Sequence, residues 1–176
     1  MVYAVIMAGG SGTRFWPKST KKYPKQFLNL FGDGTMIQNT ANRIKDIIPQ
    51  ERVLVVTNDD YVDIVKTQLP KVPQDNIVGE PVAKNTAPCV AIAAEMLLKK
   101  DPEAVMVVLP ADHHITNPAE FNNILEAAIE KAKAGTDLVT IGIRPDRSET
   151  GFGYIHANSA EKEIFSGKTV EGVYGF

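Results

Sequence analysis

Three glycines within four positions, directly after an apolar run at the N-terminus, constrain this chain more than any other feature. The apolar run, residues 2–7, lacks the alternation of a half-exposed strand, which predicts a parallel strand covered on both faces. The stretch AGGSGTRFWP (residues 8–17) follows it. Glycine lets the backbone approach an anion closely, and successive N–H groups can form an anion nest. We therefore predict that this stretch is a loop that binds phosphate.

Two cations complement the predicted loop. Arg14 lies near its end, and Lys25 follows in the sequence PKQ (residues 24–26). An arginine fork and a lysine point charge suit two different phosphates. The spacing excludes two better-known phosphate loops, because no lysine is in register for a Walker loop and Phe15 occupies the third glycine position of the dinucleotide fingerprint. A purely structural turn is the alternative interpretation of the glycines alone.

Length and composition place the chain among ordinary globular domains. It has 176 residues, of which 44% are hydrophobic and 23% charged, so residues 1–176 are expected to form one domain with a sizeable core. The net charge of -2 gives no reason to expect a nucleic-acid or anionic membrane surface. No apolar run approaches the roughly 20 residues that span a bilayer. We therefore expect small-molecule partners, with no nucleic acid and no membrane.

The single cysteine, Cys89, excludes an intramolecular disulfide and, without a signal peptide, points to a cytoplasmic protein. It lies in an apolar helical segment and is interpreted as a small buried residue rather than a nucleophile.

Strand and helix signals alternate along most of the chain. This order predicts a mixed, mostly parallel sheet with helices on both faces, a Rossmann-like α/β fold. Beyond residue 144 no helical pattern occurs, and strand-like pieces near Glu163 and at residues 170–176 predict antiparallel hairpins at the sheet edge. Because the last strand has no polar tail, we expect the natural polypeptide to continue. Strands are expected at residues 2–7, 52–57, 76–79, 104–109 and 138–143, and helices from Thr35 to Ile48, from residues 58–60 to Leu69, from Thr86 to Lys100 and over residues 118–134.

Asp112 directly follows the most hydrophobic strand, in the sequence PADHH (residues 110–114). In open α/β sheets, ligands bind at the carboxyl ends of the strands. Magnesium prefers hard oxygen ligands and typically uses one or two protein carboxylates, so Asp112 is the predicted metal ligand. The alternative is an ordinary turn aspartate. His113 and His114 do not form a recognisable zinc spacing with one cysteine and are interpreted as structural or as supporting the site indirectly.

Four segments, in this order and over nearly the whole chain, resemble the sugar-nucleotide pyrophosphorylases. They are AGGSGTR with PKQ, GEP with KNTAP (residues 79–81 and 84–88), LPADH (residues 109–113) and TGFGYI (residues 150–155). The variants FWP (residues 15–17) and QFL (residues 26–28) resemble the guanylyltransferases of this family. The resemblance implies the nucleotide-diphospho-sugar transferase fold. It also implies that the phosphate of mannose 1-phosphate attacks the α-phosphorus of GTP, giving GDP-mannose and pyrophosphate with Mg²⁺ as cofactor.

The resemblance also implies roles for individual residues. Arg14 would contact the triphosphate, Lys25 would neutralise phosphate charge during transfer, and Asp112 would hold the metal; these three are the predicted catalytic residues. Glu80 would accept hydrogen bonds from the guanine N1 and N2 groups, and Asn85 would add polar contacts unless it only caps a helix. The predicted nucleotide-binding residues are Ala8, Gly9, Gly10, Ser11, Gly12, Thr13, Arg14, Lys25, Glu80, Pro81, Asn85 and Asp112, and the predicted sugar-binding residues are Gly151, Gly153 and Tyr154, whose loop is alternatively a plain hairpin turn.

Two features of the family have no counterpart in this sequence: a Glu-Lys-Pro motif whose lysine contacts the sugar phosphate, and a second metal-binding carboxylate. We therefore expect a chain that binds GTP but turns over slowly. The alternatives are a pyrophosphorylase for another sugar 1-phosphate or nucleotide, and a noncatalytic nucleotide-binding regulatory module. The oligomeric state, including a homo-oligomer, and a fused C-terminal domain stay open.

Overall fold

Four parallel strands form the central sheet, in the order β3-β2-β1-β4. The computed structural model describes residues 1–10, 15–82 and 84–176. The strands are β1 (Val2–Met7), β2 (Val53–Asn58), β3 (Ile77–Glu80), β4 (Val105–Pro110), β5 (His156–Phe165) and β6 (Lys168–Gly175), and the α-helices are α1 (Met36–Arg43), α2 (Val62–Gln68), α3 (Thr86–Lys100) and α4 (Pro118–Ala134).

The chain divides into two compact units, Met1–Thr116 and Asn117–Phe176. The first unit holds the parallel sheet with α1, α2 and α3, and the second holds α4 and an antiparallel hairpin of β5 and β6. The first unit therefore contains the stretch AGGSGTRFWP (residues 8–17), called the glycine-rich segment from here on, together with Lys25, Glu80 and Asp112. The second unit contains Gly151 and its neighbours.

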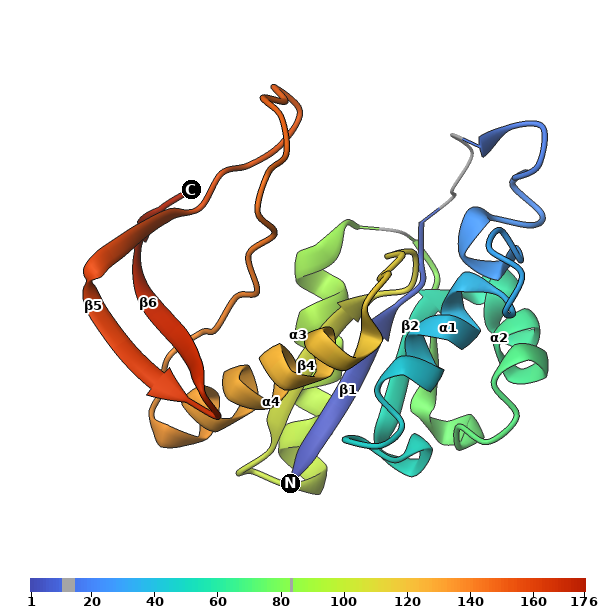
Figure 1. Ribbon diagram of the computed structural model, residues 1–176. Coiled ribbons are helices and arrows are strands. Elements are labelled where there is room, and N and C mark those ends of the chain that lie inside the picture. Colours follow the sequence, from blue (N-terminus) through green and yellow to red (C-terminus); the bar gives the residue numbers. More distant parts are fainter. Residues whose placement is uncertain (11–14, 83) are drawn as a thin grey trace. The chain divides into compact units, whose positions relative to one another are not determined.

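β1 lies between β2 and β4 and is hydrogen-bonded to both (Figure 1). Ala4, Val5 and Ile6 are completely buried, because neighbouring strands cover both edges of β1 and helices cover both faces. The unbroken apolar run at residues 2–7 is explained by this position, and the predicted buried parallel strand is confirmed.

Helices cover both faces of the sheet, as predicted. α3 packs on one face, and α1 and α2 lie on the other side (Figure 1). Alternate residues of β1 and β2 supply the two faces, since successive side chains of a strand point in opposite directions. The α3 face consists of Tyr3, Val5, Leu54 and Val56 packed on Cys89, Ala93 and Leu97, whereas Ala4, Ile6, Val53 and Val55 are buried on the opposite face.

The order of the strands creates a switch point between β1 and β4. From β1 the chain adds β2 and then β3 on one side, after which it crosses to the other side of β1 and adds β4. The crossovers therefore run in opposite directions on the two sides of β1. In open α/β sheets, ligands bind outside the carboxyl ends of the strands at such a point.

α1 begins as predicted and ends earlier than predicted. The Thr35 side chain accepts from the N–H of Gln38, and the Gln38 side chain accepts from the N–H of Thr35, which is a capping box. The regular helix stops at Arg43 instead of reaching Ile48, because the N–H of Ile44 bonds to the carbonyl of Asn42 rather than to the residue four positions back. Ile44 and Ile48 are nevertheless buried, so their apolar spacing reflects core packing without a continuous helix.

The prediction of a strand at residues 138–143 is wrong. A strand forms only with a hydrogen-bonded neighbour, and among the described residues the ladders join only the four strands β1, β2, β3 and β4 to one another and β5 to β6. Leu138 and Ile143 are accordingly exposed. The antiparallel hairpin is confirmed as β5 and β6, but it forms a two-stranded sheet of its own instead of extending the parallel sheet.

Ion pairs connect α4 with the hairpin in the second unit. Lys131 pairs with Glu163 of β5 and with Asp137, which raises the pKa of Lys131. Lys168 of β6 pairs with Glu120 in the first turn of α4 at 2.7 Å. Across both units, no helix in the described part of the chain is long and apolar enough to cross a lipid bilayer.

Gly79, which precedes Glu80 at the end of β3, packs directly against the start of the helical segment that precedes β3 in the chain, at Asp59 and Val62. A Cβ at this position would lie 2.0 Å from Asp59 Oδ1, 3.0 Å from Val62 Cγ2 and 3.1 Å from Asp59 Cα. We predict that Gly79→Ala lowers the free energy of unfolding by about 1–3 kcal/mol through overpacking, measured by urea denaturation. Gly175→Ala is the control, because nothing lies within 4 Å of its added Cβ; equal losses for both variants would contradict the prediction.

Candidate functional site

The carboxyl ends of β1 and β4 bring two predicted site segments side by side. Met7 is paired with Val56 on one side and Pro110 on the other. The pairing continues one residue further: the N–H of Ala8 donates to the carbonyl of Val56 at 2.8 Å, and the N–H of Ala111 donates to the carbonyl of Met7 at 3.0 Å. The glycines that follow Ala8 and the aspartate that follows Ala111 therefore leave the sheet next to each other.

A buried glutamine holds the beginning of the glycine-rich segment. The Gln26 side-chain amide donates to the carbonyl of Ala8 at 2.9 Å and to the carbonyl of Gly10 at 2.7 Å. The Thr57 hydroxyl also donates to the carbonyl of Ala8, at 2.9 Å. Sequence reasoning missed both residues. Gln26 could have been suspected from its position in the sequence PKQ (residues 24–26), directly after Lys25, but only the lysine was assigned a role from the sequence.

Gln26 and Lys25 share a short 3-10 helix, η2 (Lys25–Phe27), that is anchored by aromatic packing. The Phe27 ring is buried and meets the ring of Tyr61 edge to face at 5.6 Å. Gln68 of α2 donates to the carbonyl of Phe27 at 3.1 Å. Lys25 therefore lies in a turn that is held in place by the packing of the Phe27 ring and by the hydrogen bond to the Phe27 carbonyl.

Lys25 and Asp112 form an ion pair between Nζ and Oδ2. Their side chains are 26% and 30% exposed, so each retains access to solvent. The Lys25 ammonium also lies 5.9 Å from the centre of the Phe15 ring. A cation and a carboxylate from distant parts of the sequence thus meet at the switch point, where they can engage a phosphate and a divalent cation respectively.

Glu80, the last residue of β3, lies against the glycine-rich segment. It is only 7% exposed. A Cβ at Gly9 would come within 3.3 Å of Glu80 Oε2, so glycine at this position makes room for the carboxylate. Burial raises the pKa of the Cys89 thiol to about 11, and the charge of Glu80 adds to that rise. Glu80 therefore lies between the glycine-rich segment and the first turn of α3.

Asn85 occupies the N-cap position of α3 in an unusual backbone conformation. Its φ of 65° and ψ of -160° fall in a region that is normally restricted to glycine, at a cost on the order of 1–3 kcal/mol. The Asn85 side chain makes no capping hydrogen bond. The capping interpretation of Asn85 thus has no support, whereas a role toward a ligand stays a prediction. Pro81 follows Glu80 and is exposed.

The two histidines after Asp112 make structural contacts. The carbonyl of His113 accepts a hydrogen bond from Arg43 of α1 at 2.9 Å. The His114 ring stacks on Phe31, with ring centres 3.8 Å apart and planes 17° from parallel. In the part of the chain that the structure describes, no cluster of three or more His, Cys, Asp or Glu side chains is arranged to hold a metal ion.

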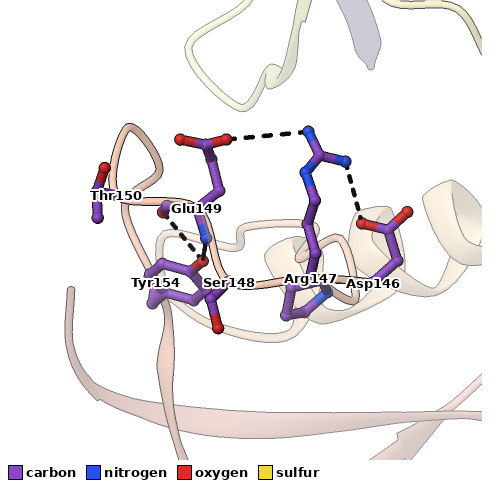
Figure 2. A pocket seen from close by; sticks show the side chains of 7 residues that line it. Asp146, Arg147, Ser148, Glu149, Thr150 and Tyr154 are labelled. Carbon is purple, nitrogen blue, oxygen red and sulfur yellow. Dashed lines mark hydrogen bonds and ion pairs between the residues drawn. The ribbon is translucent and has the colours of Figure 1, made fainter.

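Gly151, Gly153 and Tyr154 belong to a polar loop in the second unit, shown in Figure 2. The Tyr154 hydroxyl accepts from the N–H of Glu149 at 2.8 Å and donates to its carbonyl at 3.1 Å. The N–H of Gly151 donates to the Glu149 carboxylate at 3.1 Å. The loop borders a shallow, open depression of about 550 Å³, lined by Pro145, Asp146, Arg147, Ser148, Glu149, Thr150 and Tyr154.

Part of the predicted site lies outside the described residues. These predictions concern Ser11, Gly12, Thr13 and Arg14, and they stay predictions. Within the described residues, one edge of the parallel sheet brings together Ala8, Gly9, Gly10, Lys25, Glu80 and Asp112.

Comparison of the sequence with known families gives one match over nearly the whole chain. Residues 3–171 match the family described as Nucleotidyl transferase. The chain is 42% identical over 162 residues to the mannose-1-phosphate guanylyltransferase of Escherichia coli, covering 91% of this chain and 34% of that protein. It is 46% identical over 158 residues to mannose-1-phosphate guanylyltransferase ManC of Salmonella typhimurium, covering 88% and 32%. The chain thus spans about a third of the length of these curated relatives.

Solved structures agree with the fold described above. A structure described as mannose-1-phosphate geranyltransferase from Thermus thermophilus matches with a TM-score of 0.80 and 34% identity, over 89% of this chain and 45% of that one. One described as mannose-6-phosphate isomerase from Helicobacter pylori matches with a TM-score of 0.72 and 26% identity, over 90% and 56%. The predicted Rossmann-like nucleotide-diphospho-sugar transferase fold is confirmed.

The raised pKa of Cys89 leads to a prediction about its reactivity. At pH 8 a thiol with a pKa of about 11 is almost entirely protonated, so we expect alkylation roughly a hundredfold slower than for a free cysteine. Glu80→Gln removes the carboxylate charge and is expected to lower the pKa and speed alkylation. Mass spectrometry of the native protein, with the urea-unfolded chain as control, measures both rates; equal rates in Glu80→Gln and the wild type would contradict the proximity of Glu80.

Proposed function

Because the chain belongs to the nucleotidyl transferase family, we propose that it transfers GMP from GTP to mannose 1-phosphate, giving GDP-mannose and pyrophosphate. The names of its relatives support this choice of nucleotide and sugar phosphate.

One observation carries the proposal: the Lys25–Asp112 ion pair lies beside the glycine-rich segment at the switch point. A ligand with phosphates and a divalent cation offers each partner of this pair a charge of opposite sign. Gln26 and Thr57 fix the adjoining backbone, so its N–H groups are already oriented when a nucleotide arrives.

The proposed reaction needs no protein nucleophile. A phosphate oxygen of mannose 1-phosphate bonds to the α-phosphorus of GTP while the bond from this phosphorus to the leaving pyrophosphate breaks. The chain contributes in-line positioning and neutralisation of phosphate charge. Lys25 exchanges Asp112 for a phosphate oxygen, and Arg14 binds the triphosphate. The Cys89 thiol, with its raised pKa, takes no part.

Asp112 fits the role of a magnesium ligand. Its carboxylate is a hard oxygen donor that is 30% exposed. Magnesium commonly binds through one or two carboxylates and completes its shell with phosphate oxygens and waters, so a site poor in protein ligands is suitable. When bound, Mg²⁺ would neutralise phosphate charge. Asp112 would hold it at the carboxyl end of β4.

Glu80 is proposed to recognise guanine. A buried carboxylate can accept from both N1–H and the N2 amino group of guanine, a pair of donors that adenine lacks. Asn85 and Pro81 are proposed to line the same nucleotide site. Gly151, Gly153 and Tyr154 are proposed to contact the sugar, since glycines permit close backbone approach to hydroxyls.

Substitution of the ion pair tests the catalytic part of the proposal. We predict that Lys25→Ala and Asp112→Asn each lower the rate of magnesium-dependent pyrophosphate release by roughly 10²–10³-fold, because phosphate charge is no longer neutralised or the metal no longer held. Lys99→Ala is the matched control, since Lys99 forms an exposed pair with Glu95 within α3. Binding of GTP without any pyrophosphate release by the wild type would instead support a noncatalytic nucleotide-binding module.

A substrate panel tests specificity. GTP, ATP, UTP and dTTP, each paired with mannose 1-phosphate and glucose 1-phosphate, are expected to give the highest kcat/KM for GTP with mannose 1-phosphate. Glu80→Gln is expected to reduce the preference for GTP over ATP roughly 10- to 100-fold, the range of hydrogen bonds to a charged group. Glu95→Gln, an exposed α3 residue, controls for loss of charge. An unchanged GTP/ATP ratio in Glu80→Gln would refute the role of Glu80.

A further inference from the structure

Gln26 contacts the glycine-rich segment without taking a direct part in the proposed reaction. Its side chain is 3% exposed, and one amide nitrogen donates both of its N–H bonds to loop carbonyls, those of Ala8 and Gly10. The two acceptors are two residues apart and flank Gly9. A single side chain therefore spans the beginning of the glycine-rich segment.

We propose that Gln26 is a positioning residue that sets the geometry of the nucleotide-binding loop and its distance from Lys25. This inference rests on the proposed function, since it assigns a task to Gln26 only if the loop binds a nucleotide. The residue itself does not touch the reacting atoms; it acts through the backbone that does.

The conformational freedom of the loop is the reason why such a residue is needed. Gly9 and Gly10 allow the backbone to approach a phosphate, but the same freedom allows their peptide planes to rotate at little cost. In a trans peptide the C=O and N–H point in opposite directions. With the Ala8 carbonyl bonded to Gln26, the N–H of Gly9 points away from Gln26. The hydrogen bonds thus select one orientation of the donor groups before a ligand arrives.

Gln26 also sets the distance between the loop and Lys25, because the two residues are adjacent in the chain. Both residues lie in η2, which Phe27 anchors in the core. Because Gln26 binds the loop and Lys25 faces Asp112, one rigid turn fixes the loop and the cation relative to each other. The Thr57 hydroxyl supports the carbonyl of Ala8 at the start of the loop, whereas Gln26 reaches on to Gly10, so Thr57 does not replace it.

The protein contains a matched control for the simpler interpretation that Gln26 only satisfies buried carbonyls. Asn76 is 4% exposed, and its amide nitrogen donates to the carbonyls of Glu51 and Val53, both at 3.1 Å. This arrangement reproduces that of Gln26 at the opposite, amino end of β2 and β3. Loss of the Gln26 amide removes the donor to the Gly10 carbonyl and leaves the Ala8 carbonyl with Thr57 alone, whereas loss of the Asn76 amide removes its hydrogen bonds to two carbonyls. Either loss is expected to lower stability, but only Gln26 adjoins the proposed nucleotide site.

The test compares Gln26→Met, Gln26→Glu and Asn76→Leu with the wild-type chain. Each protein is titrated with GTP and MgCl₂ in a calorimeter, at a temperature well below its melting temperature. We expect the Kd for GTP to rise about tenfold or more in both Gln26 variants and to stay within about twofold in Asn76→Leu, where tenfold corresponds to about 1.4 kcal/mol. In pyrophosphate-release assays, the KM for GTP should rise while the KM for mannose 1-phosphate stays near its wild-type value.

Each outcome has a defined meaning. Equal GTP affinity in the wild type and the Gln26 variants, or equal weakening by Gln26→Met and Asn76→Leu, would overturn the positioning role while leaving the proposed function intact. If Gln26→Met does not fold, Gln26→Glu decides, because it keeps the shape of the side chain but loses its donor. A folded wild-type chain that fails to bind GTP would overturn the proposed function and this inference together.

Discussion

The site depends on hydrogen bonding along both edges of β1. Because β2 and β4 flank this strand in parallel, their carboxyl ends emerge at the same edge of the sheet as the glycine-rich segment. Met7 pairs with Val56 and with Pro110, which aligns the three chain segments to within a residue. The residues directly after β1 and β4, Ala8 to Gly10 and Asp112, therefore lie at the same edge of the sheet, and Lys25 meets Asp112 there from η2. A shift of one residue in either register would change which groups face one another.

At this edge of the sheet, buried side chains bind the backbone of Ala8 and Gly10. The carbonyls of Ala8 and Gly10 accept hydrogen bonds from Gln26, and that of Ala8 also accepts from Thr57; both donor side chains are buried. The neighbouring charges are arranged in a similar way. Lys25 is paired with Asp112, and the buried Glu80 carboxylate lies beside Gly9, where a Cβ would come within 3.3 Å of it. The molecule thus combines a backbone free to adopt unusual conformations with surroundings that restrict it to few of them.

Local sequence patterns correctly predicted the elements whose formation depends on residues close to one another in the chain. The run at residues 2–7, the cap at Thr35 and the helix Pro118–Ala134 were all predictable, because burial on two faces, capping and helical periodicity leave marks within a few residues. The strand predicted at residues 138–143 failed for the opposite reason. Its apolar composition is that of a strand, but strand formation requires a partner, which no local pattern reveals.

The site was predictable in its residue types but not in its contacts. Glycines, a lysine and an aspartate at strand ends indicated a phosphate and metal site, and the structure shows that Lys25 and Asp112 meet. Gln26 was overlooked because its acceptors lie 16 and 18 positions earlier in the chain, a distance at which only the tertiary fold brings groups together. The positive φ of Asn85 could not be predicted from the sequence either, because an asparagine at the start of a helix normally indicates an ordinary N-cap with a capping hydrogen bond.

The pairing of Lys25 with Asp112 also links ligand binding to the folding of the sheet. Lys25 lies between β1 and β2 in the sequence, whereas Asp112 follows β4. Asp112 can therefore pair with Lys25 only after β4 has docked on the side of β1 opposite β2. A partly folded chain with β1, β2 and β3 assembled would hold the lysine without its carboxylate. Any ligand that requires both groups therefore binds only the fully assembled sheet and stabilises it by mass action. Binding would thus select against species in which β4 is detached.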